Sequence, residues 1–206
     1  MPQFADITVS SFLDALASPD PTPGGGTASA VAGAMGVSLL MMVAGLPKSR
    51  SNADAEIAAL SEARASLMSV HQRILALADT DSEAYNQVVT AYRLPKTTDE
   101  EKAARKQAVQ RALRAATDAP LDTVRAAAEA MKLARLVAQH GNRSATSDVR
   151  VALELLEAAA AGATANVETN LTSLDDESYR TATASTVIDV TNTLTEDAAA
   201  CRTLLA

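Results

Sequence analysis

The chain has 206 residues, enough for one domain with a sizeable core, and we expect a single helical domain over residues 1–206. Aromatic residues make up only 2% of the chain, so the core must come from close contacts between slender helices. The formal charge of −7 disfavours binding to nucleic acids or acidic membranes, since both require Lys and Arg to neutralise phosphate. The single cysteine, Cys201, and the lack of a basic-then-apolar N-terminal segment predict a cytoplasmic location.

Two helices are expected in the first quarter of the chain. Thr8 or Ser10 can cap a short helix that ends before Pro19. Residues 28–46 contain no charge and are long enough to span a bilayer, but their many glycines and alanines favour a buried central helix instead. Small residues recur every four positions in this segment, at Ala28, Ala32 and Gly36. They form a groove where another helix can approach closely, either within the chain or in a dimer.

Apolar residues at helical spacing cover the middle of the chain. Over residues 52–92 they predict one long helix or two collinear helices interrupted near Asp79–Asp81. After a turn, Thr98 and Glu101 match a capping box that opens a charged helix ending at about Thr117. No alternation long enough to build a sheet occurs, so we expect an all-α, multi-helix bundle.

Three further helices are expected in the second half. Pro120 is predicted to begin one that ends at His140, because proline is favoured in the first helical turn. Thr146 or Ser147 can cap the next helix. The last runs from Asp176 toward Leu205, although its many β-branched residues are also compatible with a strand.

Few features point to chemistry when taken singly. Three consecutive glycines at a helix start can turn backbone N–H groups toward an anion or a flat ligand, or can simply form a flexible turn. Asp81 interrupts an apolar pattern and Asp148 lies in a first helical turn, so each is either a functional carboxylate or an acid that ends or caps a helix. His71 and His140 have no partners at metal-ligand spacing, and no metal site is predicted.

Taken in order, several segments together resemble one family. They are FLDALASPDPTPGGGTASAVAGAMG, DSEAY, LPKTTDEEKAAR, ATDAPL, GNRSATSDVRVA and GATANVETNL. This arrangement, which covers roughly residues 4–180, resembles the formiminotetrahydrofolate cyclodeaminase domains and the bacterial methenyltetrahydrofolate cyclohydrolases. The PTPGGG and GN-x-x-x-x-SD segments are the most specific parts. The chain looks most like the stand-alone cyclohydrolases, since no formiminotransferase domain is present.

The resemblance implies an all-helical homodimer that binds a tetrahydrofolate in a crevice without metal or cofactor. It implies hydrolysis of 5,10-methenyltetrahydrofolate to 10-formyltetrahydrofolate, with Asp81 as the first candidate for proton transfer and Asp148 as the second. A stand-alone cyclodeaminase and a non-catalytic folate-binding or scaffold protein remain alternatives.

The same resemblance gives candidate substrate-binding residues in two groups. The glycine loop would let backbone approach the pterin ring, through Pro23, Gly24, Gly25 and Gly26. Polar and cationic side chains would bind the rest of the folate and its glutamate tail, from Lys48, Arg50, Lys96, Asn142, Arg143 and Arg150. Gly45, Ser144 and Arg150 depart from the family pattern, and Arg150 could bind the tail, fill the pocket or mark an altered substrate.

Overall fold

The computed structural model describes residues 4–47 and 54–206. Within these residues the chain forms six α-helices and no strand, which confirms the all-α prediction. The helices are α1 (Val9–Ala17), α2 (Gly25–Gly45), α3 (Asp54–Tyr92), α4 (Asp99–His140), α5 (Thr146–Leu171) and α6 (Glu177–Leu204). Two short 3-10 turns, η1 (Phe4–Asp6) and η2 (Arg143–Ala145), precede α1 and α5.

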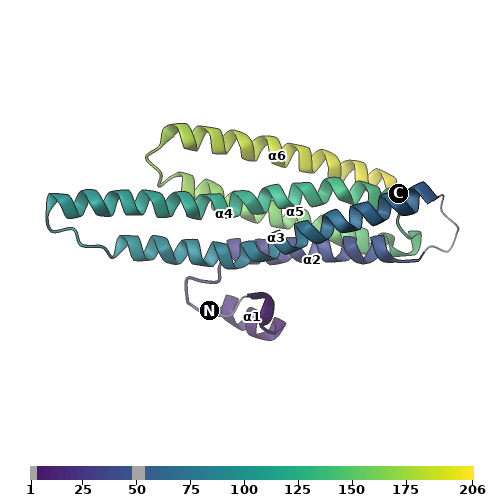
Figure 1. Ribbon diagram of the computed structural model, residues 1–206, viewed down its shortest axis with the longest axis horizontal. Helices are drawn as coiled ribbons and strands as arrows, with labels where there is room; N and C mark the ends of the chain where they lie inside the picture. Colours follow the sequence, from purple (N-terminus) through teal and green to yellow (C-terminus); the bar gives the residue numbers. More distant parts are fainter. Residues whose placement is uncertain (1–3, 48–53) are drawn as a thin grey trace.

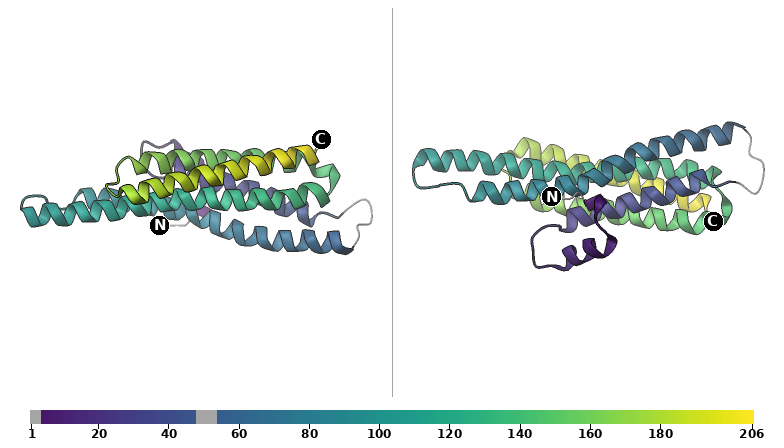
Figure 2. Two further views of the ribbon diagram at one scale, coloured as in Figure 1. Left: turned by 90° about the horizontal axis from the view of Figure 1, so that it is seen from above. Right: turned by 60° about the horizontal axis from the view of Figure 1, so that its bottom comes forward.

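Four helices, α2 to α5, form the central bundle, and α6 packs along α4 (Figure 1). The hairpin of α3 and α4 projects past the ends of the other helices as an arm, which both views of Figure 2 show. The short helix α1 lies outside the bundle (Figures 1 and 2). None of its residues is buried.

The core is built from thin helices packed closely together. Its largest fully buried side chains include Leu40, Ile74, Leu153 and Leu156. On α2, a Cβ at Gly36 would lie 2.9 Å from the carbonyl oxygen of Ala152 on α5, so α2 and α5 approach almost backbone to backbone. The small-residue groove therefore serves packing within the chain at Gly36, whereas Ala28 and Ala32 are only half-buried.

The prediction that Pro120 begins a helix is wrong, because α4 continues through it. A proline inside a helix has no N–H to donate to the carbonyl four residues earlier, which here belongs to Ala116. That oxygen instead accepts a hydrogen bond of 2.7 Å from Nδ2 of Asn170 on α5. A partner more than fifty residues away thus satisfies the carbonyl that the proline leaves free.

The other helix boundaries test the remaining predictions. Thr8 caps α1 as expected, and the capping box of Thr98 and Glu101 at the start of α4 is present. The predicted cap of α5 is wrong: α5 begins at Thr146 without a side-chain cap, because the preceding turn η2 is capped by Asn142.

Two open questions about helices are resolved. The helix α3 runs unbroken through Asp79–Asp81, so these acids do not end it. The β-branched segment near the C-terminus is helical, and Asp176 caps its first turn by accepting a hydrogen bond from the backbone N–H of Tyr179. The helix prediction for α6 is confirmed.

Candidate active site

A cavity of about 250 Å³ lies where α2 begins, between α3, α4 and the C-terminal half of α5. The glycine loop forms one wall and helices form the others. Its lining residues are Pro21, Thr22, Gly24, Gly25, Gly26, Asp81, Tyr85, Val88, Leu113, Ala116, Asn166, Thr169 and Asn170. The structure therefore brings together two segments that the sequence analysis had singled out separately, the three glycines and Asp81.

Asp81 lies against the first turn of α2. Its Oδ2 accepts a hydrogen bond of 3.0 Å from the hydroxyl of Thr27, and that hydroxyl is 3.0 Å from the hydroxyl of Ser82. A Cβ on Gly26 would overlap the carboxylate of Asp81. The absence of a side chain at residue 26 is therefore what allows the carboxylate to contact the start of α2.

The environment of Asp81 changes its acidity. Burial raises the pKa of its carboxyl group above the usual value, while hydrogen bonds from the side chain and backbone of Thr27 oppose this shift. Desolvation is the largest of these effects, so the net shift is upward. A carboxylate with a raised pKa is a better proton acceptor than an exposed one, which suits a general base.

Two asparagines of α5 complete the polar wall. Nδ2 of Asn166 donates to the carbonyl of Gly162 over 2.8 Å, and Nδ2 of Asn170 donates to Ala116 over 2.7 Å. Each amide nitrogen thereby gives one of its two N–H groups to a backbone carbonyl. The amide oxygens keep both of their lone pairs, so they are the stronger acceptors that this wall offers to a ligand.

The cavity has apolar walls beside these acceptors. Val88 and Leu113 belong to the smaller of the two apolar clusters, while Tyr85 is 42% exposed. Among residues 4–47 and 54–206, no Lys or Arg lines the cavity. A flat, donor-rich and positively charged ring fits this combination, whereas an anionic group would find no cation here.

The other predicted site residues lie elsewhere in the chain. Pro23 is buried, and it follows a cis peptide bond after Thr22. Asp148 is in the first turn of α5, about 27 Å along that helix from Asn166 at 1.5 Å per residue. Lys96 is exposed in the turn at the tip of the α3–α4 arm, and Lys48 and Arg50 lie outside the described residues.

Asn142, Arg143 and Arg150 surround the end of the bundle where the chain terminates. Nδ2 of Asn142 donates to the carbonyl of Pro47 over 2.6 Å. Each arginine donates over 3.0 Å to a carbonyl at the C-terminal end of α6, Arg143 to Leu204 and Arg150 to Leu205. These cations thus interact with the last carbonyls of α6, where positive charge is favoured.

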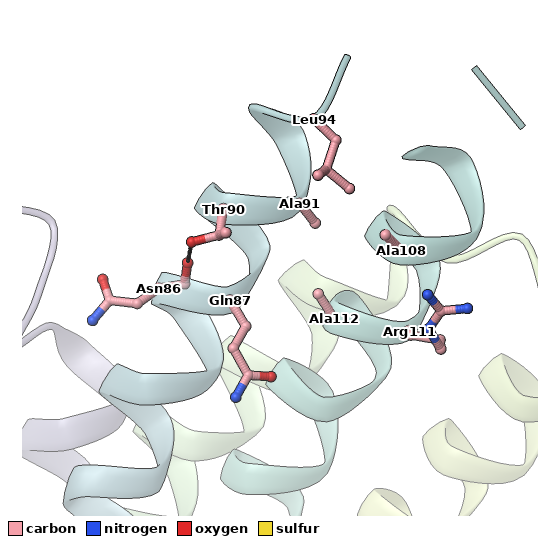
Figure 3. Close-up of a pocket in the computed structure, with 8 residues that line it drawn as sticks. All are labelled: Asn86, Gln87, Thr90, Ala91, Leu94, Ala108, Arg111 and Ala112. Carbon is pink, nitrogen blue, oxygen red and sulfur yellow. Dashed lines mark hydrogen bonds between the residues drawn. The ribbon is translucent and has the colours of Figure 1, made fainter. Parts of the chain in front are cut away.

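A larger groove of about 470 Å³ lies on the α3–α4 arm. Figure 3 shows side chains of both helices around it, including Gln87 and Arg111, together with Leu94 just after α3. In the part of the chain that the structure describes, no predicted site residue lines it and Arg111 is its one ionisable lining group. A reaction that needs proton transfer finds its carboxylate in the cavity at Asp81 and not in this groove.

Sequence reasoning missed Asn166 and Asn170. They are spaced i and i+4, which places both on one face of α5. The usable signal was indirect: a proline within a long helical pattern frees one carbonyl, and a buried carbonyl requires a donor. Nothing in the linear sequence indicated that Asn170 was this donor.

Comparisons with known proteins agree with this architecture. Residues 8–188 match the formiminotransferase-cyclodeaminase family. A methenyltetrahydrofolate cyclohydrolase of Methylorubrum extorquens is 41% identical over 84% of this chain and 83% of its own length. The formimidoyltransferase-cyclodeaminase of Gallus gallus is 30% identical, and this chain spans 33% of it. The crystal structure of a formiminotetrahydrofolate cyclodeaminase from Thermotoga maritima has the same fold, with a TM-score of 0.87 at 24% identity over 98% of this chain and 96% of that one. The chain belongs to the formiminotransferase-cyclodeaminase family.

Proposed function

We propose that the chain is a methenyltetrahydrofolate cyclohydrolase, which hydrolyses 5,10-methenyltetrahydrofolate to 10-formyltetrahydrofolate. The observation that carries the proposal is the desolvated carboxylate of Asp81 in an acceptor-lined cavity. The substrate is a cation whose positive charge is shared by N5, N10 and the carbon between them. Identity of 41% to a named cyclohydrolase over most of both chains supports the same reaction.

The reaction needs one proton acceptor that later becomes a donor. The carboxylate of Asp81 accepts a proton from water as the water oxygen bonds to the carbon between N5 and N10. The resulting adduct is neutral at this centre, and the carboxylic acid then returns the proton to N5 as the carbon–N5 bond breaks. The adduct hydroxyl releases its own proton, which leaves the formyl group on N10 and one proton in solution.

Thr27 and the start of α2 assist this cycle. The Thr27 hydroxyl bonds to Asp81, and the positive end of a helix dipole stabilises a carboxylate in front of it. These interactions hold the ionised form in place, while burial keeps its basicity high. In this proposal Asp148 and the cations at the other end of the bundle have no part in the chemical step. The step uses water and a carboxylate, so we propose that no metal or cofactor takes part.

A cyclodeaminase is the second candidate, since formimidoyltransferase-cyclodeaminases match most of this chain. Ammonia would leave from the same carbon centre instead of water adding to it. A folate-binding scaffold without catalysis is the third candidate. The geometry of the cavity does not distinguish the three, and the higher identity to the cyclohydrolase favours the first.

One spectroscopic assay separates these candidates. Purified protein mixed with 5,10-methenyltetrahydrofolate should remove the methenyl absorbance faster than buffer alone, and chelator should not change the rate. Appearance of that absorbance and of ammonia from 5-formiminotetrahydrofolate would instead identify a deaminase. Binding of folate without either change would favour the scaffold.

We also propose that the chain is a cytoplasmic homodimer, with the exposed face of α2 as its interface. This helix has the length and composition of a membrane span, yet half of it is buried inside the bundle. Its outer face is uncharged and includes Met35, 55% exposed, and Met42, 42% exposed. In an acidic protein, an uncharged apolar face is the surface on which two copies repel each other least.

The exposed apolar residues of α1 also support a second copy of the chain as the partner that covers the α2 face. Val9 and Leu13 of α1 are 77% and 57% exposed, and no residue of this helix is buried. One chain therefore presents two apolar surfaces that a symmetric dimer can cover together. Cys201 is buried, and burial raises the pKa of its thiol to about 11, so this thiol is poorly reactive. Cysteines introduced at the surface can therefore be cross-linked without interference from Cys201.

Disulfide cross-linking tests the interface and its direction. If two copies of α2 pack antiparallel about Met35, M35C should form a disulfide-linked dimer on mild oxidation. Because Ala28 and Met42 are equally far from residue 35, A28C mixed with M42C should then cross-link, whereas neither should cross-link alone. Efficient cross-linking of A28C alone and of M42C alone would indicate a parallel pair. Sedimentation as a monomer at micromolar concentration would contradict the dimer.

A further inference from the structure

The cavity contains a polar contact that depends on an unusual residue. Pro120 is buried in the middle of α4, where it cannot donate to the carbonyl of Ala116. In a regular helix the proline ring also clashes with this carbonyl, which disfavours an ordinary helical hydrogen bond there. Ala116 and Asn170 both line the cavity, and Nδ2 of Asn170 donates to this carbonyl over 2.7 Å.

This contact fixes the orientation of the Asn170 amide. A carbonyl oxygen only accepts hydrogen bonds, so the nitrogen end of the amide must face Ala116. The oxygen end, Oδ1, then points away from Ala116, and no described residue donates a hydrogen bond to it. The amide is half-buried and lines the cavity, so its oxygen is held in place and is free to accept from a ligand.

Comparison with Asn166 shows how Pro120 affects the orientation of Asn170. Its amide donates to Gly162, the carbonyl four residues earlier on the same helix, and that bond needs no second helix. The Asn170 bond instead joins α5 to α4 across the cavity. Loss of Pro120 would therefore release Asn170 but not Asn166.

We propose that Asn170 determines ligand specificity by accepting a hydrogen bond from a ring N–H group of the tetrahydrofolate, and that Pro120 positions it by freeing the Ala116 carbonyl. This inference rests on the proposed function. A reduced pterin carries amino and ring N–H donors along one edge, which matches an acceptor at this wall. A ligand without donors there leaves the amide oxygen unpaired and is rejected.

The experiment separates the loss of the Asn170 amide from the loss of a hydrogen-bond donor for the Ala116 carbonyl. N170A alone removes the ligand contact but also leaves the Ala116 carbonyl without a donor. P120A supplies a new N–H to that carbonyl, so P120A/N170A lacks the amide while every carbonyl of α4 near the cavity keeps a partner. T172A, an exposed position just after α5, is the matched control.

The variants are compared by KM and kcat for 5,10-methenyltetrahydrofolate and by the Kd for 5-formyltetrahydrofolate, with far-UV spectra to verify folding. N170A and P120A/N170A should each raise KM and Kd about tenfold, the worth of one hydrogen bond, with kcat within about threefold of the parent. P120A should raise them less, because its amide is present but free to turn. The T172A protein should match the parent.

Three results would overturn the inference while leaving the proposed function intact. The first is a parent enzyme that works and a P120A/N170A protein whose KM and Kd lie within twofold of it. The second is a fall in kcat without a change in KM, which would make Asn170 part of the chemical step. The third is a KM for P120A equal to that of the parent. If the parent itself neither bound nor hydrolysed the folates, the proposed function would fail instead.

Discussion

A methyl group at Gly26 is the smallest change that tests the site geometry. The new Cβ would occupy the space that the Asp81 carboxylate now fills, so one of the two must move. The carboxylate is the end of a short side chain and can rotate, whereas residue 26 is fixed in the first turn of α2. In the Gly26→Ala protein we expect Asp81 to turn away from Thr27 and from the cavity.

The cost in stability should be small. Losing the bond between the Thr27 hydroxyl and a carboxylate costs about 1.5–3 kcal/mol. Replacing glycine by alanine in a helix stabilises the folded state by about 0.5–1 kcal/mol. The net loss is therefore about 0.5–2.5 kcal/mol, or roughly 1–10 °C in Tm for a chain of this size. Turnover should fall far more, by about 10²–10⁴-fold, because the proton acceptor is displaced.

Thermal unfolding and the methenyl absorbance assay measure both quantities on the same sample. Gly25→Ala is the matched control, since a Cβ there meets its nearest neighbour, Nδ2 of Asn166, at an ordinary 3.6 Å. That variant should keep Asp81 in place and retain most of the parent kcat, and because residue 25 lines the cavity, its added methyl should act on KM instead. A Gly26→Ala protein with the parent kcat would refute the placement of Asp81. A loss of stability well above about 2.5 kcal/mol would show that α2, and not the side chain, had moved.

Three further predictions concern stability. Because burial raises the pKa of Asp81 above its unfolded value of 3.8, the folded state holds this proton more tightly, and the parent loses stability as pH rises through the folded pKa. Urea titrations of the Asp81→Asn protein and the parent should therefore show that the difference in free energy of unfolding, variant minus parent, rises between acid pH and pH 7. A fall in this difference would contradict the desolvation of Asp81. Gly36→Ala should lower stability by about 1–3 kcal/mol, because the backbone of Ala152 must move, and an unchanged urea midpoint would argue against this packing. Leu156→Ala removes a fully buried side chain and should cost about 2–5 kcal/mol with an unchanged m-value; a smaller loss would place Leu156 outside the core.

The helices were predictable where local signals act alone. The caps at Thr8 and Thr98 depend on residues within one turn, and both are found where the sequence placed them. The boundary at Pro120 was wrong because its outcome depends on Asn170, which reaches Ala116 only after α4 and α5 have packed together. Tertiary contacts of this kind leave no periodic trace in the sequence.

The candidate site was predictable in part and for a different reason. Proximity of Gly26 and Asp81 follows from the packing of α2 on α3, which spacing alone does not reveal, so the link came from the family resemblance. The resemblance also grouped Asp148 and Asn142 with these residues, yet α5 separates Asp148 from the cavity by about 27 Å within one chain. Whether these residues take part in catalysis stays a prediction.

The kcat of the Asp81→Asn protein for 5,10-methenyltetrahydrofolate tests the central claim most directly. Asparagine keeps the shape of the side chain and can still accept from Thr27, but it cannot take up a proton. The account predicts a fall of about 10²–10⁴-fold in kcat, a much smaller change in folate binding and no loss of stability at pH 7. A kcat within about threefold of the parent would contradict it, because such a small change lies far below the contribution of a general base, and Asp81 would then serve only to cap the start of α2.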